Sequence, residues 1–276
     1  MKIVMTLLVR DEQDIIRENI EYHLSQGVDH IIATDNKSVD STADILKEYE
    51  AGGVLKYIFE GGDDYSQYKW VTRMARMACL ECGADWVINN DADEFWWPRY
   101  GSLKDVFANV PDEYNVVNAR RTNFVLTTND GRPFYQRMIY REAVSLNSLG
   151  NPLPQKVAHR SSPMVEVAQG NHRVAVIGDV SALHDQVEIL HFPVRSYKQI
   201  LNKIIKGGAA YDRNVDLGKA VGNTWRKLYE EYKKDSNVLS YYADQFHPDD
   251  RINSRLSHNE ILKDCRLRDY LDGLLG

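Results

Sequence analysis

The sequence of 276 residues lacks several features that would each point to a particular class of protein. Its three cysteines are too few, and odd in number, for a disulfide framework, so we expect a protein of the reducing cytoplasm. No apolar run approaches the roughly 18 residues of a membrane helix, so we predict no integral membrane segment. The apolar N-terminal run 1–9 has no small-residue cleavage site after it, and we interpret it as a strand rather than a signal peptide.

Positive charge is also scarce, with 34 Lys and Arg against 40 Asp and Glu and a net charge of −6. Because a nucleic-acid-binding protein needs a basic face, we predict no nucleic-acid partner. The turn after the first apolar run, residues 9–12, contains no glycine, so it cannot be the loop that cradles a dinucleotide. A Walker A loop is missing as well. These absences argue against a Rossmann dehydrogenase and a P-loop nucleotidase.

Apolar runs alternate regularly with helical patterns over the first 90 residues. Such alternation predicts an α/β fold with a parallel sheet flanked by helices on both faces, and ligands in such sheets bind at the carboxyl ends of the strands. Strands are predicted at 2–9, 30–34, 54–59 and 86–89, and helices at 11–26 and 67–81. A further helix is predicted to start near Asp40 or Ser41, where Ser41 and Asp44 fit a capping box, and to end at Gly52-Gly53.

The rest of the chain is less regular. Residues 129–190 are rich in glycine and proline, and we expect a loop-rich antiparallel region that shapes an acceptor pocket. Further predicted elements are a helix at 102–109 capped by Ser102, strands at 115–126 and 188–192, a helix from Ser196 to Gly207-Gly208, and helices at 219–234 and 252–275. These changes of pattern divide the chain into 1–110, 111–210 and a helical extension at 211–276.

The most informative stretch is 84–98, where a short apolar run gives way to Asp91, Asp93 and Glu94. Residues i and i+2 of a strand point to the same face, so Asp91 and Asp93 could converge on one point. Two crowded carboxylates repel each other unless a cation lies between them, and Mg²⁺ or Mn²⁺ prefers such oxygen ligands. A solvated turn is the alternative, but the tryptophans at 86, 96 and 97 favour a built site.

Three segments together resemble glycosyltransferase family 2, and within it a bacterial subgroup. They are Val-Arg-Asp-Glu at 9–12, the block at 84–98 that contains Asp-Ala-Asp-Glu-Phe-Trp-Trp-Pro, and His-Phe-Pro-Val-Arg-Ser at 191–196. The resemblance implies a GT-A fold, with a nucleotide-sugar-binding half at 1–110 and an acceptor-side half at 111–210. It also implies Mn²⁺ or Mg²⁺, an inverting transfer from a UDP- or GDP-type sugar donor, and a glycan or lipid-linked acceptor. It also implies a role in cell-surface polysaccharide synthesis, in the cytoplasm with loose membrane association.

The resemblance further implies roles for individual residues. Asp91, Asp93 and His191 would hold the metal. The donor nucleotide would be bound by residues at the strand ends and nearby, namely Val9, Arg10, Glu12, Asp35, Asn36, Arg73, Asp91, Ala92, Asp93 and Arg195.

The catalytic base is not singled out, because the Glu-Asp motif usual in the family does not appear. Asp185, Glu166 and His172 are the candidates for the group that takes the acceptor's proton. Two other functions stay open: a catalytically silent carbohydrate- or nucleotide-binding protein of the same fold, and a nucleotidyltransferase.

Overall fold

The computed structural model describes residues 1–64, 66–147, 150–214, 218 and 221–276. The chain divides into two compact units. Unit 1 comprises Met1–Gly61, Ser66–Thr122 and Leu153–His191, and unit 2 comprises Gly62–Tyr65, Asn123–Pro152 and Phe192–Gly276.

Unit 1 is built on one mixed sheet whose strand order is β3-β2-β1-β4-β8-β6-β12-β5, with β11 beside β6. The strands β1 to β4 are mutually parallel, whereas β8 runs antiparallel to both of its neighbours and β12 antiparallel to β5. The strands of this sheet are β1 (Ile3–Val9), β2 (His30–Asp35), β3 (Leu55–Phe59), β4 (Trp86–Asp91), β5 (Glu94–Pro98), β6 (Val116–Asn123), β8 (Lys156–Arg160), β11 (Ala182–Leu183) and β12 (Val187–His191).

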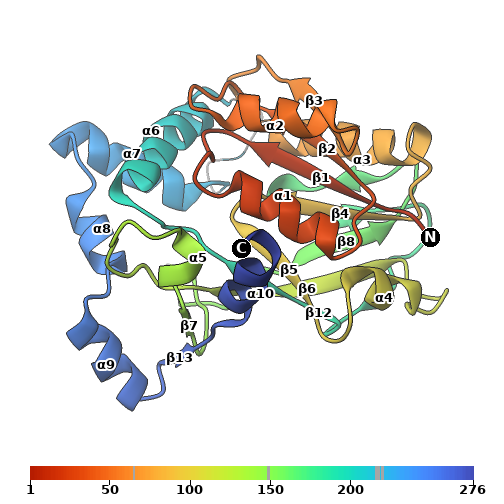
Figure 1. Ribbon diagram of the computed structural model, residues 1–276. Coiled ribbons are helices and arrows are strands. Elements are labelled where there is room, and N and C mark those ends of the chain that lie inside the picture. The colour runs from red at the N-terminus through yellow and green to blue at the C-terminus, as the bar shows by residue number, and fades with distance from the viewer. Residues whose placement is uncertain (65, 148–149, 215–217, 219–220) are drawn as a thin grey trace. The chain divides into compact units, whose positions relative to one another are not determined.

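Helices cover both faces of the parallel strands (Figure 1). These helices are α1 (Ile16–Ser25), α2 (Thr42–Ala51) and α3 (Gln67–Leu80), with the short α4 (Leu103–Ala108) beside β5. The connections between parallel strands are right-handed, and from β1 through β2 to β3 the chain moves in one direction across the sheet, so α1 and α2 lie on the same face. From β3 the chain returns past β1 to β4, so α3 lies on the opposite face. On the α3 face, Met74 and Ala78 pack against Val4 and Val87. The predicted α/β class, a sheet with a parallel core flanked by helices, is confirmed.

The parallel register brings the carboxyl ends of the strands to one edge. Val9 of β1 is level with Asp35 of β2, and Leu8 is level with Asp91 of β4. Arg10, which follows Val9, therefore lies at the same edge. The predicted convergence of polar residues thus follows from the order and register of the strands.

A small two-stranded sheet of β9 (Glu166–Val167) and β10 (Val174–Ala175) belongs to the α3 side of unit 1. A short 3₁₀ turn, Gln169–Asn171, connects the two strands. Val165 and Val167 share the core of α3. The region predicted to be loop-rich and antiparallel therefore contributes short strands, although β11 runs parallel to β6.

Unit 2 is mainly helical, with one two-stranded sheet of β7 (Tyr140–Glu142) and β13 (Ile261–Lys263). Its helices are α5 (Phe134–Arg137), α6 (Tyr197–Arg213), α7 (Asn223–Asp235), α8 (Leu239–Gln245), α9 (Asp249–Ser257) and α10 (Arg266–Leu275). Its core brings Ile200 and Ile204 of α6 together with Leu228 of α7. No helix within the described ranges is long and apolar enough to cross a membrane.

Two sequence predictions for unit 2 are wrong in detail, and one helix was missed. The helix predicted to stop at Gly207-Gly208 continues to Arg213, and the helix predicted over 252–275 is interrupted by β13. Helix α8 was not predicted. The helix predicted over 219–234 starts at residues outside those described, and its described part is α7.

Candidate active site

Several of the predicted donor-binding residues lie near the carboxyl ends of β1, β2 and β3. The Arg10 guanidinium donates to Asn36 Oδ1 at 3.4 Å, and the Asn36 amide donates to the backbone oxygen of Glu60 at 3.2 Å. Arg73 of α3 forms an ion pair with the Glu60 carboxylate at 3.2 Å. Contacts across the strand ends thus connect three of the predicted residues to one another.

Asp35 is buried at this edge and accepts two hydrogen bonds. Tyr57 Oη donates to one carboxylate oxygen at 3.0 Å, and the backbone N–H of Ser38 donates to the other. Burial, and then the hydrogen bond to Asp35, raise the pKa of Tyr57 to about 12. Val9 and Glu12 are buried nearby, and the Glu12 backbone N–H donates to Thr42 Oγ1.

A turn joins β4 to β5 and carries the acidic motif, and α1 fixes it through buried amides. Asn19 of α1 donates to the backbone oxygens of Ala92 and Glu94, at 3.0 and 2.8 Å. Its own side-chain oxygen accepts from Asn90, and Asn90 in turn accepts from the Trp96 indole at 3.0 Å. All five residues are buried, so the turn's backbone is held from one side by a connected polar network.

His23 extends this network. Its Nδ1 lies 2.7 Å from the backbone oxygen of Asn19, and its Nε2 accepts from the backbone N–H of Trp96 at 3.3 Å. The ring is therefore the neutral tautomer with hydrogen on Nδ1. Burial lowers the pKa of His23 to about 4, so it stays uncharged at neutral pH.

Three side chains at the end of this turn could hold a metal ion: Asp93, Glu94 and His191. Their potential ligand atoms all lie within 4.8 Å of one another, and His191 Nε2 is 3.6 Å from Asp93 Oδ1. The pairing of β12 with β5 explains the meeting, because His191 is directly opposite Glu94 in this antiparallel register. Asp93 and His191 were predicted from the sequence as metal ligands, whereas Glu94 was not.

A lysine that sequence analysis did not single out lies among the acids. Lys156 of β8 is 1% exposed, and its Nζ contacts the Asp91 carboxylate and lies 3.4 Å from Glu94 Oε1. Asp91 also accepts from Asn171 Nδ2 at 3.0 Å. The structure therefore directs Asp91 toward Lys156 and Asn171, and the described metal cluster contains Glu94 in its place. Lys156 lies within residues 129–190, which the sequence predicts to be loop-rich, and no sequence pattern marks it as a site residue.

Glu94 is completely buried, and its Oε2 atom has no hydrogen-bond partner among the described residues. Burial raises the pKa of Glu94 to about 7, although the positive charges of Lys156 and Arg121 oppose this rise. A buried carboxylate oxygen without a partner is costly. A divalent cation would satisfy that oxygen, and the mixed set of two carboxylates and an imidazole suits Mn²⁺ or Mg²⁺.

The three candidate bases have different surroundings. Asp185 pairs with Arg120 at 3.2 Å and lies two residues before the start of β12, whereas His191 is the last residue of that strand. Glu166 is exposed on β9 and pairs with Arg76 at 3.7 Å.

His172 is close to the acidic end of β4. Its Nδ1 lies 2.9 Å from the backbone oxygen of Gln155, the residue before Lys156. Burial, and then the charges of Lys156 and Arg121, lower the pKa of His172 to about 4, whereas Asp91 opposes the shift. Of the three candidates, His172 is the one whose electrostatic neighbours include Asp91 and Lys156.

Arg195, predicted to face the diphosphate, belongs to unit 2 and is 1% exposed. Its guanidinium donates to the backbone oxygen of Phe192 at 3.0 Å, and its own backbone oxygen accepts from Arg137 at 2.6 Å. These contacts place Arg195 in the core of that unit.

Comparison with known proteins gives one family and several similar structures. The model of glycosyltransferase family 92 matches residues 4–241. The structure of S. aureus TarS 1–349 is 15% identical in sequence, and the similarity covers 85% of this chain and 73% of TarS 1–349, with a TM-score of 0.44. The structure of TarS 1–349 in complex with UDP is 16% identical, and the similarity covers 84% of this chain and 71% of that chain, with a TM-score of 0.44.

Glucosyl-3-phosphoglycerate synthase from Mycobacterium tuberculosis, in complex with Mn²⁺, UDP and glucosyl-3-phosphoglycerate, is 17% identical over 44% of each chain, with a TM-score of 0.32. No relative was found among curated proteins. The expected glycosyltransferase class is confirmed by the family match, and the narrower assignment to family 2 stays a prediction. Because the match spans most of its length, the chain belongs to glycosyltransferase family 92.

Proposed function

We propose that this protein is a metal-dependent, inverting glycosyltransferase that moves a sugar from a nucleoside-diphosphate donor to a hydroxyl group of a glycan or lipid-linked acceptor. The observation that carries the proposal is the cluster of Asp93, Glu94 and His191, at the end of the turn that follows β4. Membership of a glycosyltransferase family supplies the reaction class. Residues 1–110 would bind most of the donor, and 111–210 the acceptor.

Asp93, Glu94 and His191 would hold Mn²⁺ or Mg²⁺, and the unpartnered Oε2 atom of Glu94 is the strongest sign that the cluster fits a cation. When bound, the ion would neutralise the negative charge that develops on the departing diphosphate. Asp91 would complete the carboxylate motif at this edge, either through water on the metal or through the donor's ribose. Its pairing with Lys156 keeps a positive charge next to the diphosphate.

Arg10, Asp35 and Asn36 would bind the nucleoside at the neighbouring strand ends, and Arg73 would approach it from α3. The site would also be lined by buried backbone and side-chain atoms of Val9, Glu12 and Ala92. Arg195 has a different environment within unit 2, and a part in donor binding would require its guanidinium to leave Phe192.

In the reaction, the acceptor hydroxyl oxygen attacks the anomeric carbon as the bond to the diphosphate breaks, through an oxocarbenium-like state. The hydroxyl proton passes to a base, and the nucleoside diphosphate leaves. We assign His172 this role ahead of Asp185 and Glu166. His172 Nδ1 donates a hydrogen bond to the backbone oxygen of Gln155, so in the neutral ring Nε2 is left as the acceptor beside the acidic edge.

The test is turnover of UDP- and GDP-sugars, read as release of the nucleoside diphosphate, with and without a chelator. Removing the metal should abolish release, and returning Mn²⁺ should restore it. Asp93→Asn and His191→Gln should each lower the rate by at least about a hundredfold, the usual scale for lost charge stabilisation. Asp244→Asn, at an exposed carboxylate of α8, is the matched control and should keep the wild-type rate.

Turnover that is equal with and without chelator would contradict the metal's part in the proposal. Metal-dependent nucleotide binding with no turnover of any donor would instead favour the silent binding protein.

A further inference from the structure

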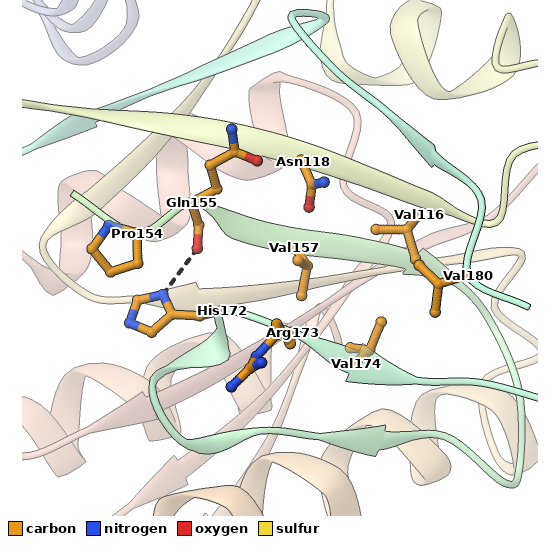
Figure 2. Close-up of a pocket in the computed structure, with 9 residues that line it drawn as sticks. All are labelled: Val116, Asn118, Pro154, Gln155, Val157, His172, Arg173, Val174 and Val180. Atoms are coloured by element: carbon orange, nitrogen blue, oxygen red, sulfur yellow. Dashed lines mark hydrogen bonds between the residues drawn. The ribbon is translucent and has the colours of Figure 1, made fainter. Parts of the chain in front are cut away.

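A pocket of about 720 Å³ lies on the α3 face of unit 1, between the sheet and the segment that includes β10. Val116, Val157 and Val174 give it apolar walls. His172 lies at one end and Asn118 across from it (Figure 2). Pockets of this size are typical of small-molecule sites with apolar walls and a few polar groups.

The pocket adjoins the candidate active site. Gln155 lines it, and the next residue, Lys156, contacts Asp91; His172 lines it, and the preceding residue, Asn171, donates to Asp91. The register agrees with this placement. Val87 of β4 is opposite His159 of β8, so the two side chains point to the same face of the sheet. Asp91 is four residues after Val87 and Val157 is two residues before His159, so both of them point to that face as well.

The polar groups of the pocket indicate what it could bind. Arg173 is exposed on its lining, and no described residue forms an ion pair or hydrogen bond with its guanidinium. The Asn118 side-chain amide likewise has no hydrogen-bond partner in the described part of the chain. The pocket thus offers one unpaired positive charge, one amide that both donates and accepts, and an apolar surface.

We propose that this pocket is the acceptor subsite and binds a sugar residue that carries an anionic group, a carboxylate or a phosphate. The Arg173 guanidinium binds the anion through paired N–H donors. The amide of Asn118 binds ring hydroxyls, and the valines pack against the apolar face of the ring. The acceptor hydroxyl then lies between His172 and the sugar bound at the Asp91 edge. This inference rests on the proposed glycosyltransferase function.

The test measures binding of D-glucuronate, D-glucose 6-phosphate and neutral D-glucose to the whole chain by NMR titration. The Arg173 Nε–Hε signal, identified by its loss in Arg173→Gln, should move with at least one anionic sugar. Arg173→Gln should weaken binding of that sugar at least tenfold and leave weak D-glucose binding unchanged. Arg173→Lys should restore only part of the affinity, because the ammonium group keeps the charge but not the paired donors. The matched control is Arg17→Gln on α1, whose partner is Glu48, and it should have no effect.

Binding of glucuronate alone would identify a carboxylate acceptor, and binding of the phosphate alone a phosphorylated one. Equal binding of D-glucose and the anionic sugars, no binding of either anionic sugar, or no effect of Arg173→Gln would overturn the inference. The same samples are titrated with UDP and Mn²⁺. A chain that binds nucleotide with metal but no anionic sugar refutes the pocket assignment alone. A chain that binds neither refutes the proposed function too.

Discussion

Lys156 places an ammonium group between two carboxylates in the interior of unit 1. It is 1% exposed, and Glu94 beside it is not exposed at all. Taking such charges out of water is expensive, and their mutual attraction offsets the cost only while all partners are present. Glu94 can therefore stay buried because Lys156, from the strand next to β4, accompanies it.

Replacing this lysine should be costly. Lys156→Met leaves Asp91 and Glu94 without their shared cation, and we expect a loss of roughly 3 to 5 kcal/mol in the free energy of unfolding, measured by urea denaturation at pH 7. The matched control is Lys104→Met, which removes the pair with Asp29 at about one third exposure. It should cost less than about 1 kcal/mol, as surface pairs do. Equal losses in the two variants would contradict this account.

The residues of the candidate site were predictable only in part. Asp91 and Asp93 stood out as an acidic pair, but the inference that both face one point assumed an unbroken strand. A turn at residues 92–93 ends the strand after Asp91, and Glu94 starts the next strand opposite His191. Lys156 meets Asp91 across 65 residues of sequence, and no local pattern can reveal such a contact.

At the scale of elements, α1 supports the acidic turn through Asn19 and His23. Both bond to backbone atoms of that turn or to each other, so the helix fixes the position of the carboxylates without contributing a ligand. This support should make the stability depend on pH, because burial keeps His23 neutral at pH values where an exposed histidine is protonated.

The pKa of His23 is about 4 in the folded protein and about 6.5 in an unfolded chain. Between these values the unfolded state binds more protons, so the stability that His23 contributes is present above pH 6.5 and is lost as pH falls toward 4. The wild-type protein should lose about 2 kcal/mol from this group between pH 7 and pH 5.

Urea denaturation at pH 5 and pH 7 checks this expectation. His23→Gln should lack that part of the pH dependence, so its stability should change less between the two conditions. His159, also buried with a pKa lowered to about 4, is present in both proteins and cancels in the comparison. Parallel pH profiles for wild type and variant would show that His23 does not titrate as described.

Elements with a strong periodic pattern were predicted well, and those set by packing were not. The apolar runs of β1, β2 and β4 are buried strands because each lies inside a sheet covered on both faces, whereas β3 is an edge strand and is only partly buried. The two glycines at 207 and 208 were interpreted as the end of a helix. In the structure α6 continues through them, because a Cβ on Gly208 would lie 2.2 Å from Tyr229 Cβ of α7. Gly208 therefore allows the two helices to approach, whereas a side chain at Gly207 would meet nothing within 4 Å. A single sequence cannot distinguish a glycine at a helix contact from one that ends a helix.

Helix caps give the same lesson. Ser102 and Asp105 form the predicted capping box at α4, and Ser196 accepts from the backbone N–H of Gln199. Ser41 makes no side-chain cap at α2, where Asp40 accepts from the backbone N–H of Thr42 instead. Several adjacent residues can serve as a cap, and tertiary contacts decide which one does.

At the scale of unit 1, the parallel strands bring most of its acidic candidates to one edge. Asp35, Asp91 and Asp93 are found there, with Arg10 and Lys156 as nearby cations. A nucleoside diphosphate would meet repulsion at such an edge unless further positive charge accompanied it. The requirement for a divalent cation is therefore the central claim of the account.

The measurement that tests this claim most directly is the thermal stability of the whole chain with UDP- and GDP-sugars, with and without Mn²⁺. A ligand that binds the folded state raises the melting temperature by mass action. The account predicts a rise for one nucleotide class that requires Mn²⁺ and disappears in Asp93→Asn, but not in Asp244→Asn. A rise of the same size without metal, or one that Asp93→Asn leaves intact, would contradict it.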